Sequence, residues 1–329
     1  MNTSSHSSSS LPSSSLFVGI DVAQQKLDLG RSDCSKVLTV TNDAVGIAAV
    51  VKELLDAKPT CIVLEATGGL EEPLLDALLD AGLPVARVNP AQVRHFAKGL
   101  GILAKTDRID AGVLVEFARR AEPRLAEKRR QIQAELESLV TCRRQLIASR
   151  TGHLNQVKRT SFRPAVKAQK SVLKTLDDQV KFLDVQIRKL IEADDDFNNL
   201  DQLLQSVPGV GDVASSTLVA ELRELGHADR RQIGALVGVV PFNRDSGMQK
   251  GTRSIRGGRA AVRSALYMAT ITAIRCNPVI KAFATRLKTI GKKKNKIVIV
   301  AYMRKLITIL NAMIRENLQW NQLKLVKNA

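Results

Sequence analysis

A heptad pattern in the middle of the chain constrains its fold more than any other feature. Apolar residues recur in steps of three and four over 173–190, and a weaker matching series over 132–146 is broken by Arg143. This spacing predicts two long helices that pack along a shared seam, with the turn between them around Ser161 to Lys170, which includes Pro164. We therefore expect an antiparallel coiled-coil hairpin within residues 122–200. The pattern fits a dimerisation element and a spacer equally well.

Two parts of different character precede this hairpin. Residues 1–15 are mostly serine and cannot bury a core, so we interpret them as a disordered tail. Over 16–121, three short runs of strand type are followed by alternating helical and buried-strand patterns. This order predicts an α/β domain of the ribonuclease-H-like (RuvC-like) type.

Four acidic residues mark a candidate site in this α/β domain. Asp21 ends the first strand, and Glu65 ends the run TCIVLE, where open α/β sheets place their ligands. Asp107 and Asp110 are three apart in a helical pattern, which puts them on one face. Oxygen ligands from three elements predict a site for Mg²⁺ or Mn²⁺. Each residue also has an ordinary explanation, as a turn former, a partner of lysine or a helix cap, so the prediction depends on their combination.

Positive charge is concentrated in the last part of the chain, which we treat as one mainly helical domain over 201–329. Between Arg244 and Lys305 there are sixteen basic residues and one acidic residue, against twelve and fourteen over 16–121. The whole chain carries a formal charge of +18, which favours nucleic acid over membrane as the partner. No apolar run reaches membrane-spanning length, so we expect a cytoplasmic protein that is nucleoid-associated when active. The four cysteines are widely spaced, so neither structural zinc nor a disulfide framework is expected.

Ser246 stands among turn formers, glycines and cations. The glycines allow the backbone to approach a ligand, and the cations suit a phosphodiester that the serine hydroxyl attacks. A basic binding loop with an incidental serine explains the same local composition. Aromatic residues are scarce at 3% of the chain, so phosphate contacts should dominate binding over base stacking.

The segment VPGVG, between two helical patterns over 203–222, resembles a helix-hairpin-helix motif. In that motif the glycine-rich turn offers backbone N–H groups to a DNA phosphate. A plain turn between two helices is the alternative. The predicted nucleic-acid-binding residues are Gly209 and Gly211 in this turn, Arg244, Lys250, Arg253, Arg256, Arg259 and Arg263 around the serine, and Lys292, Lys293 and Lys294 further along.

Taken together, these motifs resemble the DEDD-type transposases of insertion sequences (the insertion sequence 110 family), relatives of the Piv DNA invertases. The resemblance rests on D…E…KTDRIDA, a helical middle, VPGVG, and P-x-x-x-D-S-G-x-x-x-G-x-x-x-I-R-G-G-R, and it runs from about Leu16 to beyond Tyr267. It implies a catalytic and metal-binding tetrad of Asp21, Glu65, Asp107 and Asp110, with Ser246 as the nucleophile.

The resemblance also implies a reaction and its partners. Such a recombinase cuts one strand at each of two DNA sites, joins DNA to the serine and exchanges strands. A structured noncoding RNA, the bridge RNA, pairs with both donor and target DNA, and a homodimer assembles to a tetramer on DNA. Because a helical hairpin separates the tetrad from the serine, we expect the two halves of the site to come from different subunits.

Three other classes of protein would explain part of the same pattern. A RuvC-like junction nuclease would use the same carboxylates with metal-activated water, leaving Ser246 dispensable. A phosphotransferase of the sugar-kinase type needs a second glycine-rich phosphate loop after a later strand, and the sequence shows none in a strand context. A non-catalytic nucleic-acid-binding protein explains the charge and leaves the four acidic residues without a role.

Overall fold

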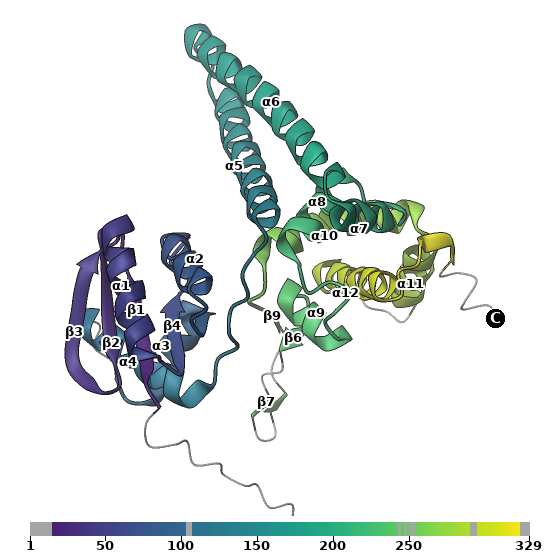
Figure 1. Ribbon diagram of the computed structural model, residues 1–329. Coiled ribbons are helices and arrows are strands. Elements are labelled where there is room, and N and C mark those ends of the chain that lie inside the picture. Colours follow the sequence, from purple (N-terminus) through teal and green to yellow (C-terminus); the bar gives the residue numbers. More distant parts are fainter. Residues whose placement is uncertain are drawn as a thin grey trace, which may run out of the picture. The chain divides into compact units, whose positions relative to one another are not determined.

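The computed structural model describes most of the chain in two compact units (Figure 1). By their contacts the units are residues 1–129 and 130–329, so the helical hairpin and the basic region lie in one unit. The residues described are 15–102, 107–242, 245–246, 249–250, 254–289 and 295–322. Within these ranges, the side chains of 107–108, 242, 245–246, 249–250, 288 and 295–297 lie outside the description.

The N-terminal unit is built on a mixed five-stranded sheet of order β3-β2-β1-β4-β5. Strands β1 (Phe17–Val22), β2 (Lys26–Arg31) and β3 (Cys34–Thr41) are antiparallel neighbours. Strands β4 (Cys61–Glu65) and β5 (Val85–Val88) continue the sheet in parallel with β1. With the mostly helical remainder, this sheet confirms the predicted α/β-plus-helical layout.

Helices cover both faces of this sheet. Helices α1 (Ala44–Ala57) and α2 (Glu72–Asp80) share a core with one face, and α3 (Pro90–Gly99) and α4 (Asp107–Ala121) share a core with the other. Neighbouring residues of a strand point to opposite faces. Val18 and Ile20 therefore belong to the first core, and Phe17 belongs to the second.

Local signals account for the starts of two helices in this unit, α1 and α3. Asp43 caps α1 by accepting hydrogen bonds from the N–H groups of Val45 and Gly46. Helix α3 was not anticipated from the sequence. Its start does carry two recognised signals, because Asn89 accepts from the Ala91 N–H and Pro90 occupies the first turn.

The C-terminal unit begins with the predicted hairpin. Helices α5 (Gln131–Arg159) and α6 (Arg163–Glu192) run side by side (Figure 1). The placement of Pro164 in the turn was wrong, because this residue lies in the first turn of α6, where its missing N–H costs no hydrogen bond. Arg143, which interrupts the apolar series, pairs across the hairpin with Asp184 at 2.5 Å.

A helical body follows, and the base of the hairpin packs into its core. The body contains α7 (Asp195–Gln205), α8 (Asp212–Glu221), α9 (Arg230–Val237), α10 (Ala260–Cys276), α11 (Pro278–Thr289) and α12 (Asn295–Arg315). Leu136 of α5 and Ile191 of α6 belong to the same buried cluster as Leu218 and Leu266. The amide Nε2 of buried Gln133 also donates to the Ala220 carbonyl at 2.5 Å. Among the helices described, none has the length and apolar character needed to cross a membrane.

Candidate functional site

Asp21 and Glu65 occupy neighbouring positions on adjacent parallel strands. The register pairs Ile20 of β1 with Leu64 of β4, and Asp21 and Glu65 are the next residues of each strand. Both carboxylates therefore stand at the carboxyl ends of their strands and on the same face of the sheet. That face is the one covered by α3 and α4, because Phe17, four residues before Asp21, packs into their core.

A glycine in β1 brings α4 directly onto this face. A Cβ atom at Gly19 would lie 2.5 Å from Leu114 Cβ, 2.6 Å from Val115 N and 2.7 Å from Ala111 O. Only a residue without a side chain fits so close to a helix backbone. The approach sets the first turns of α4 on the side of the sheet that carries Asp21, and Asp110 immediately precedes Ala111.

The predicted tetrad is thus only partly defined by the structure. Asp21, Glu65 and Asp110 are partly buried, whereas the side chain of Asp107 lies outside the described residues. Within the described part of the chain, no three carboxylate, histidine or cysteine side chains come together as metal ligands. The shared metal site of all four carboxylates stays a prediction.

Sequence reasoning missed Asp28, which lies directly opposite Asp21 in the antiparallel β1–β2 pair. The Asp28 side chain is buried, accepts a hydrogen bond from Thr39 Oγ1 at 2.5 Å and lies 3.0 Å from Lys26 Nζ. These partners give Asp28 a structural role beside Asp21. The alternation of Lys26 and Asp28 along one face of a strand was the available signal.

Glu71 was also missed, and it organises the loop that follows Glu65. Its buried Oε2 accepts hydrogen bonds from the N–H groups of Thr67 and Gly69, both at 2.9 Å. Arg87 Nη1 lies 3.7 Å from the other carboxylate oxygen. The Thr67 hydroxyl donates to the carbonyl of Glu65 at 3.0 Å. A buried carboxylate thus holds the backbone on which Glu65 depends.

The described residues around Ser246 form two short antiparallel strand pairs, so Ser246 itself lies in a strand and not in the loop expected from the neighbouring turn formers. We call the segment 241–255 the Ser246 ribbon. Strand β6 (Pro241–Phe242) pairs with β9 (Ser254–Ile255), and β7 (Asp245–Ser246) pairs with β8 (Gln249–Lys250). The pairing satisfies backbone N–H and carbonyl groups that an open loop would leave to solvent. The side chains of Ser246, Arg244, Lys250, Arg253, Lys292, Lys293 and Lys294 lie outside the described residues, so their assigned roles stay predictions.

Two of the predicted phosphate-binding arginines are engaged within the fold. Arg259 forms a two-pronged pair with the Glu224 carboxylate, with both N–O distances at 2.6 Å, and its Nη1 also donates to the Glu221 carbonyl at 2.8 Å. Arg263 Nη1 donates to the carbonyl of Gly257 at 2.6 Å. Arg256 is exposed. The acidic and carbonyl partners of Arg259 and Arg263 were not foreseen from the sequence.

The Arg259–Glu224 pair makes stability depend on pH. Burial on its own would raise the pKa of Glu224, but the hydrogen bonds and charge of Arg259 outweigh it and hold that pKa below its usual range. The pair therefore stabilises the fold fully above the unfolded-state pKa of about 4.3, and its contribution is lost as the pH falls through the folded-state pKa.

We expect Glu224→Gln to lower the free energy of unfolding at pH 7 by roughly 1–3 kcal/mol, the range for hydrogen bonds to charged groups. The loss relative to wild type should shrink in acid, where the wild-type carboxylate is itself protonated. Urea unfolding at pH 7 and near pH 3 measures both effects. Glu316→Gln, which changes an exposed carboxylate of the same unit, is the control, and an equal loss in both variants would contradict this account.

The VPGVG turn connects α7 to α8. Close packing explains why position 209 in this turn is a glycine. A Cβ atom at Gly209 would lie 2.6–2.7 Å from the backbone and Cβ of Ala273 in α10. The side chain of Asn277 donates to the carbonyl of Pro208 at 3.3 Å, which ties the turn to the same region. Gly211 has open space around it and begins α8 without a side-chain cap. The binding of phosphate by Gly209 and Gly211 stays a prediction.

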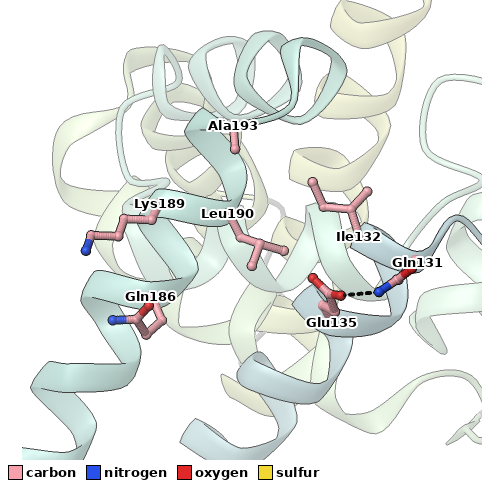
Figure 2. Close-up of a pocket in the computed structure, with 7 residues that line it drawn as sticks. All are labelled: Gln131, Ile132, Glu135, Gln186, Lys189, Leu190 and Ala193. Carbon is pink, nitrogen blue, oxygen red and sulfur yellow. Dashed lines mark hydrogen bonds between the residues drawn. The ribbon is translucent and has the colours of Figure 1, made fainter.

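A surface hollow of about 490 Å³ lies between the two arms of the hairpin at their base (Figure 2). Figure 2 shows the Gln131 amide at its rim donating to Glu135 at 2.9 Å. The other lining residues are Ile132 from α5, Gln186, Lys189 and Leu190 from α6, and Ala193, which follows α6. None of the predicted catalytic or nucleic-acid-binding residues is among them, so we assign this hollow no part in the reaction.

Comparison with known proteins identifies the class. Residues 18–160 match the model of a DEDD transposase family of the IS110 type, and residues 201–285 match the transposase IS116/IS110/IS902 family. The pilin gene-inverting protein of Moraxella bovis is 28% identical over 319 residues, which cover 92% of this chain and 97% of that protein. The transposase for insertion sequence element IS1111A of Coxiella burnetii is 25% identical over 265 residues, which cover 70% of each.

The α/β sheet with its strand-end carboxylates and the two matched segments define a DNA-recombining enzyme of the transposase class. The two models together match most of the chain and follow one another in the order that the sequence motifs predict. This chain belongs to the IS110 family of transposases.

Proposed function

We propose that this transposase cuts donor and target DNA and rejoins the strands through a covalent link to Ser246. Asp21, Glu65, Asp107 and Asp110 would hold the divalent cation that the reaction uses. The observation that carries the proposal is the placement of Asp21 and Glu65 side by side at the carboxyl ends of β1 and β4, on the face that α4 covers. Two matches to transposase families support it. The first, over residues 18–160, contains the four acidic residues, and the second, over 201–285, contains Ser246.

The donor set suits Mg²⁺ or Mn²⁺. Carboxylate oxygens are the ligands these cations prefer, and two carboxylates on neighbouring strands repel each other unless a cation neutralises them. A divalent cation bound there supplies Lewis-acid polarisation of the phosphate. The chain itself contributes the fixed positions: Glu71 holds the loop after Glu65, and Gly19 admits α4.

At Ser246 the proposed chemistry exchanges one phosphodiester for another. The hydroxyl oxygen attacks phosphorus and loses its proton, a serine–phosphate bond forms, and the bond to the departing sugar oxygen breaks as that oxygen gains a proton. Because the bond count is unchanged, the reverse attack by a second strand rejoins DNA without ATP. Cations close to Ser246 in the sequence, Arg244 and Lys250 among them, would stabilise the charge on the phosphate oxygens.

We propose that a bridge RNA selects donor and target sequences by pairing with both, and that the chain acts as a homo-oligomer, from dimer to tetramer. The charge distribution supports an RNA–DNA partner, since the stretch from Ser246 to Arg315 contains no acidic residue. Aromatic residues make up only 3% of the chain, so phosphate contacts would supply most of the affinity. Sequence choice is then left to base pairing.

A RuvC-like nuclease that uses metal-activated water is the second candidate. One observation favours it: Arg259 and Arg263 are engaged by partners within the fold, which removes two of the cations expected around the serine. In that case the same carboxylates act alone, and the Ser246 ribbon serves only to hold DNA.

The two candidates are separated by a plasmid substrate carrying the native flanking DNA, incubated with the protein and with RNA transcribed from that DNA. We expect Ser246→Ala to reduce both cleavage and strand exchange by at least about 10³-fold, as removal of a nucleophile does. Ser246→Ala protein that still cuts the DNA at the wild-type rate would establish the nuclease instead.

A further inference from the structure

The described residues just before and just after the Ser246 ribbon cross backbone to backbone. Gly238 ends α9 with φ 76° and begins the outgoing leg, and Gly258 closes the returning leg. A Cβ atom at Gly258 would lie 2.5 Å from Gly238 Cα and 2.7 Å from Val237 C. A Cβ atom at Gly238 would in turn meet the carbonyl oxygen of Gly257. The two legs touch backbone to backbone.

Arg263 bridges this crossing from the first turn of α10. Its Nη1 donates to the carbonyl of Gly257 on the returning leg at 2.6 Å and to the carbonyl of Val237, the last residue of α9 before the outgoing leg, at 3.3 Å. One guanidinium group therefore contacts both legs. The backbone bond from Arg259 N to the Leu236 carbonyl, at 2.8 Å, ties the returning leg to α9 a second time.

The pairing of Arg259 with Glu224 anchors the same point to the body. Glu224 lies in the segment that follows α8. Its two-pronged contact with Arg259 therefore ties the end of the returning leg to that segment as well. Two arginines, Arg259 and Arg263, and two close-packed glycines, Gly238 and Gly258, thus hold the base of the ribbon through contacts within the fold.

We infer that Arg263 is a positioning residue, which holds the Ser246 ribbon in a fixed direction by joining its two legs, and that it does not act as a phosphate contact. The part of this inference that concerns reaction rate rests on the proposed role of Ser246. A small rotation at the base of the ribbon would displace Ser246, which lies further along it. A displacement of about 1 Å in a reacting group can cost about 10²-fold in rate.

Arg263→Lys tests the inference, because lysine keeps the positive charge and loses the planar fork. We expect faster hydrogen exchange over 236–242 and 254–258 in this variant, DNA affinity and its salt dependence unchanged, and strand joining slowed about 10–100-fold. Arg263→Ala should behave in the same way. Arg275→Ala, which removes an exposed arginine of the same helix, is the control and should leave the exchange of both segments unchanged.

The opposite pattern would overturn the inference. If Arg263 contacts phosphate, Arg263→Lys stays close to wild type, whereas Arg263→Ala binds DNA more weakly with a salt slope reduced by about 0.9 and leaves exchange in the ribbon unchanged. The hydrogen-exchange readout needs no reaction. Faster exchange combined with an active Ser246→Ala protein would therefore refute the proposed nucleophile and leave the positioning role standing. If Arg263→Ala does not fold, Arg263→Lys gives the same decision.

Discussion

Replacing Gly19 by alanine should lower the free energy of unfolding of the N-terminal unit by about 3 kcal/mol, the upper end of the cost of overpacking a core. The added methyl group would stand within 2.7 Å of three atoms of α4, two of them backbone atoms that cannot rotate away. Helix α4 must then shift off β1, and Asp110 shifts with it. Urea unfolding and hydrogen exchange over 109–118 measure the two effects.

Gly112→Ala is the matched control, since Gly112 lies in α4 itself and nothing stands within 4 Å of its Cβ position. Alanine in a helix interior should stabilise by up to about 1 kcal/mol relative to glycine. Destabilisation of equal size in the two variants would show that α4 does not lie on β1 as the structure has it.

Glu65→Gln should abolish strand cleavage, with a loss of about 10³-fold or more. Glutamine has nearly the same size, but it cannot supply the negative charge that holds a divalent cation, and metal ions contribute several kcal/mol to such reactions. A chelator should reduce wild-type activity to the level of the variant.

Asp56→Asn controls for the loss of one negative charge in the same unit, because Asp56 is exposed on α1, which covers the opposite face of the sheet. Cleavage by this variant should match wild type. Full activity of Glu65→Gln would remove Glu65 from the site and with it the observation that carries the proposed function.

The positions of Asp21 and Glu65 at their strand ends could be predicted because the signals for them are local. The change from strand to helical periodicity locates the end of each strand, and a carboxylate at the end of a parallel strand must stand at the edge of the sheet. That is where the structure places Asp21 and Glu65. Gly19 gives no such signal, because its purpose depends on a helix that starts almost ninety residues later.

The partners of Arg259 and Arg263 could not be predicted either, because they too depend on contacts between distant parts of the chain. A basic cluster has the same composition whether its cations face phosphate or a glutamate of the same chain. Arg259 meets Glu224 across 35 residues of sequence, and Arg263 meets carbonyl groups that only the fold brings near. Pro164 was misplaced for a different reason. Proline is common both in turns between helices and in the first turn of a helix, so its presence alone does not tell the two apart.

The most direct test of the central claim is a search for protein covalently joined to DNA. Wild type, Ser246→Ala and Asp107→Asn are each incubated with Mg²⁺, native flanking DNA and its RNA, denatured in detergent, treated with nuclease and mapped by mass spectrometry. We expect a nucleotide adduct on the Ser246 peptide in wild type and in neither variant. DNA that is cut equally by wild type and Ser246→Ala, with no adduct in either, would contradict the account and leave the carboxylates as the whole catalytic site.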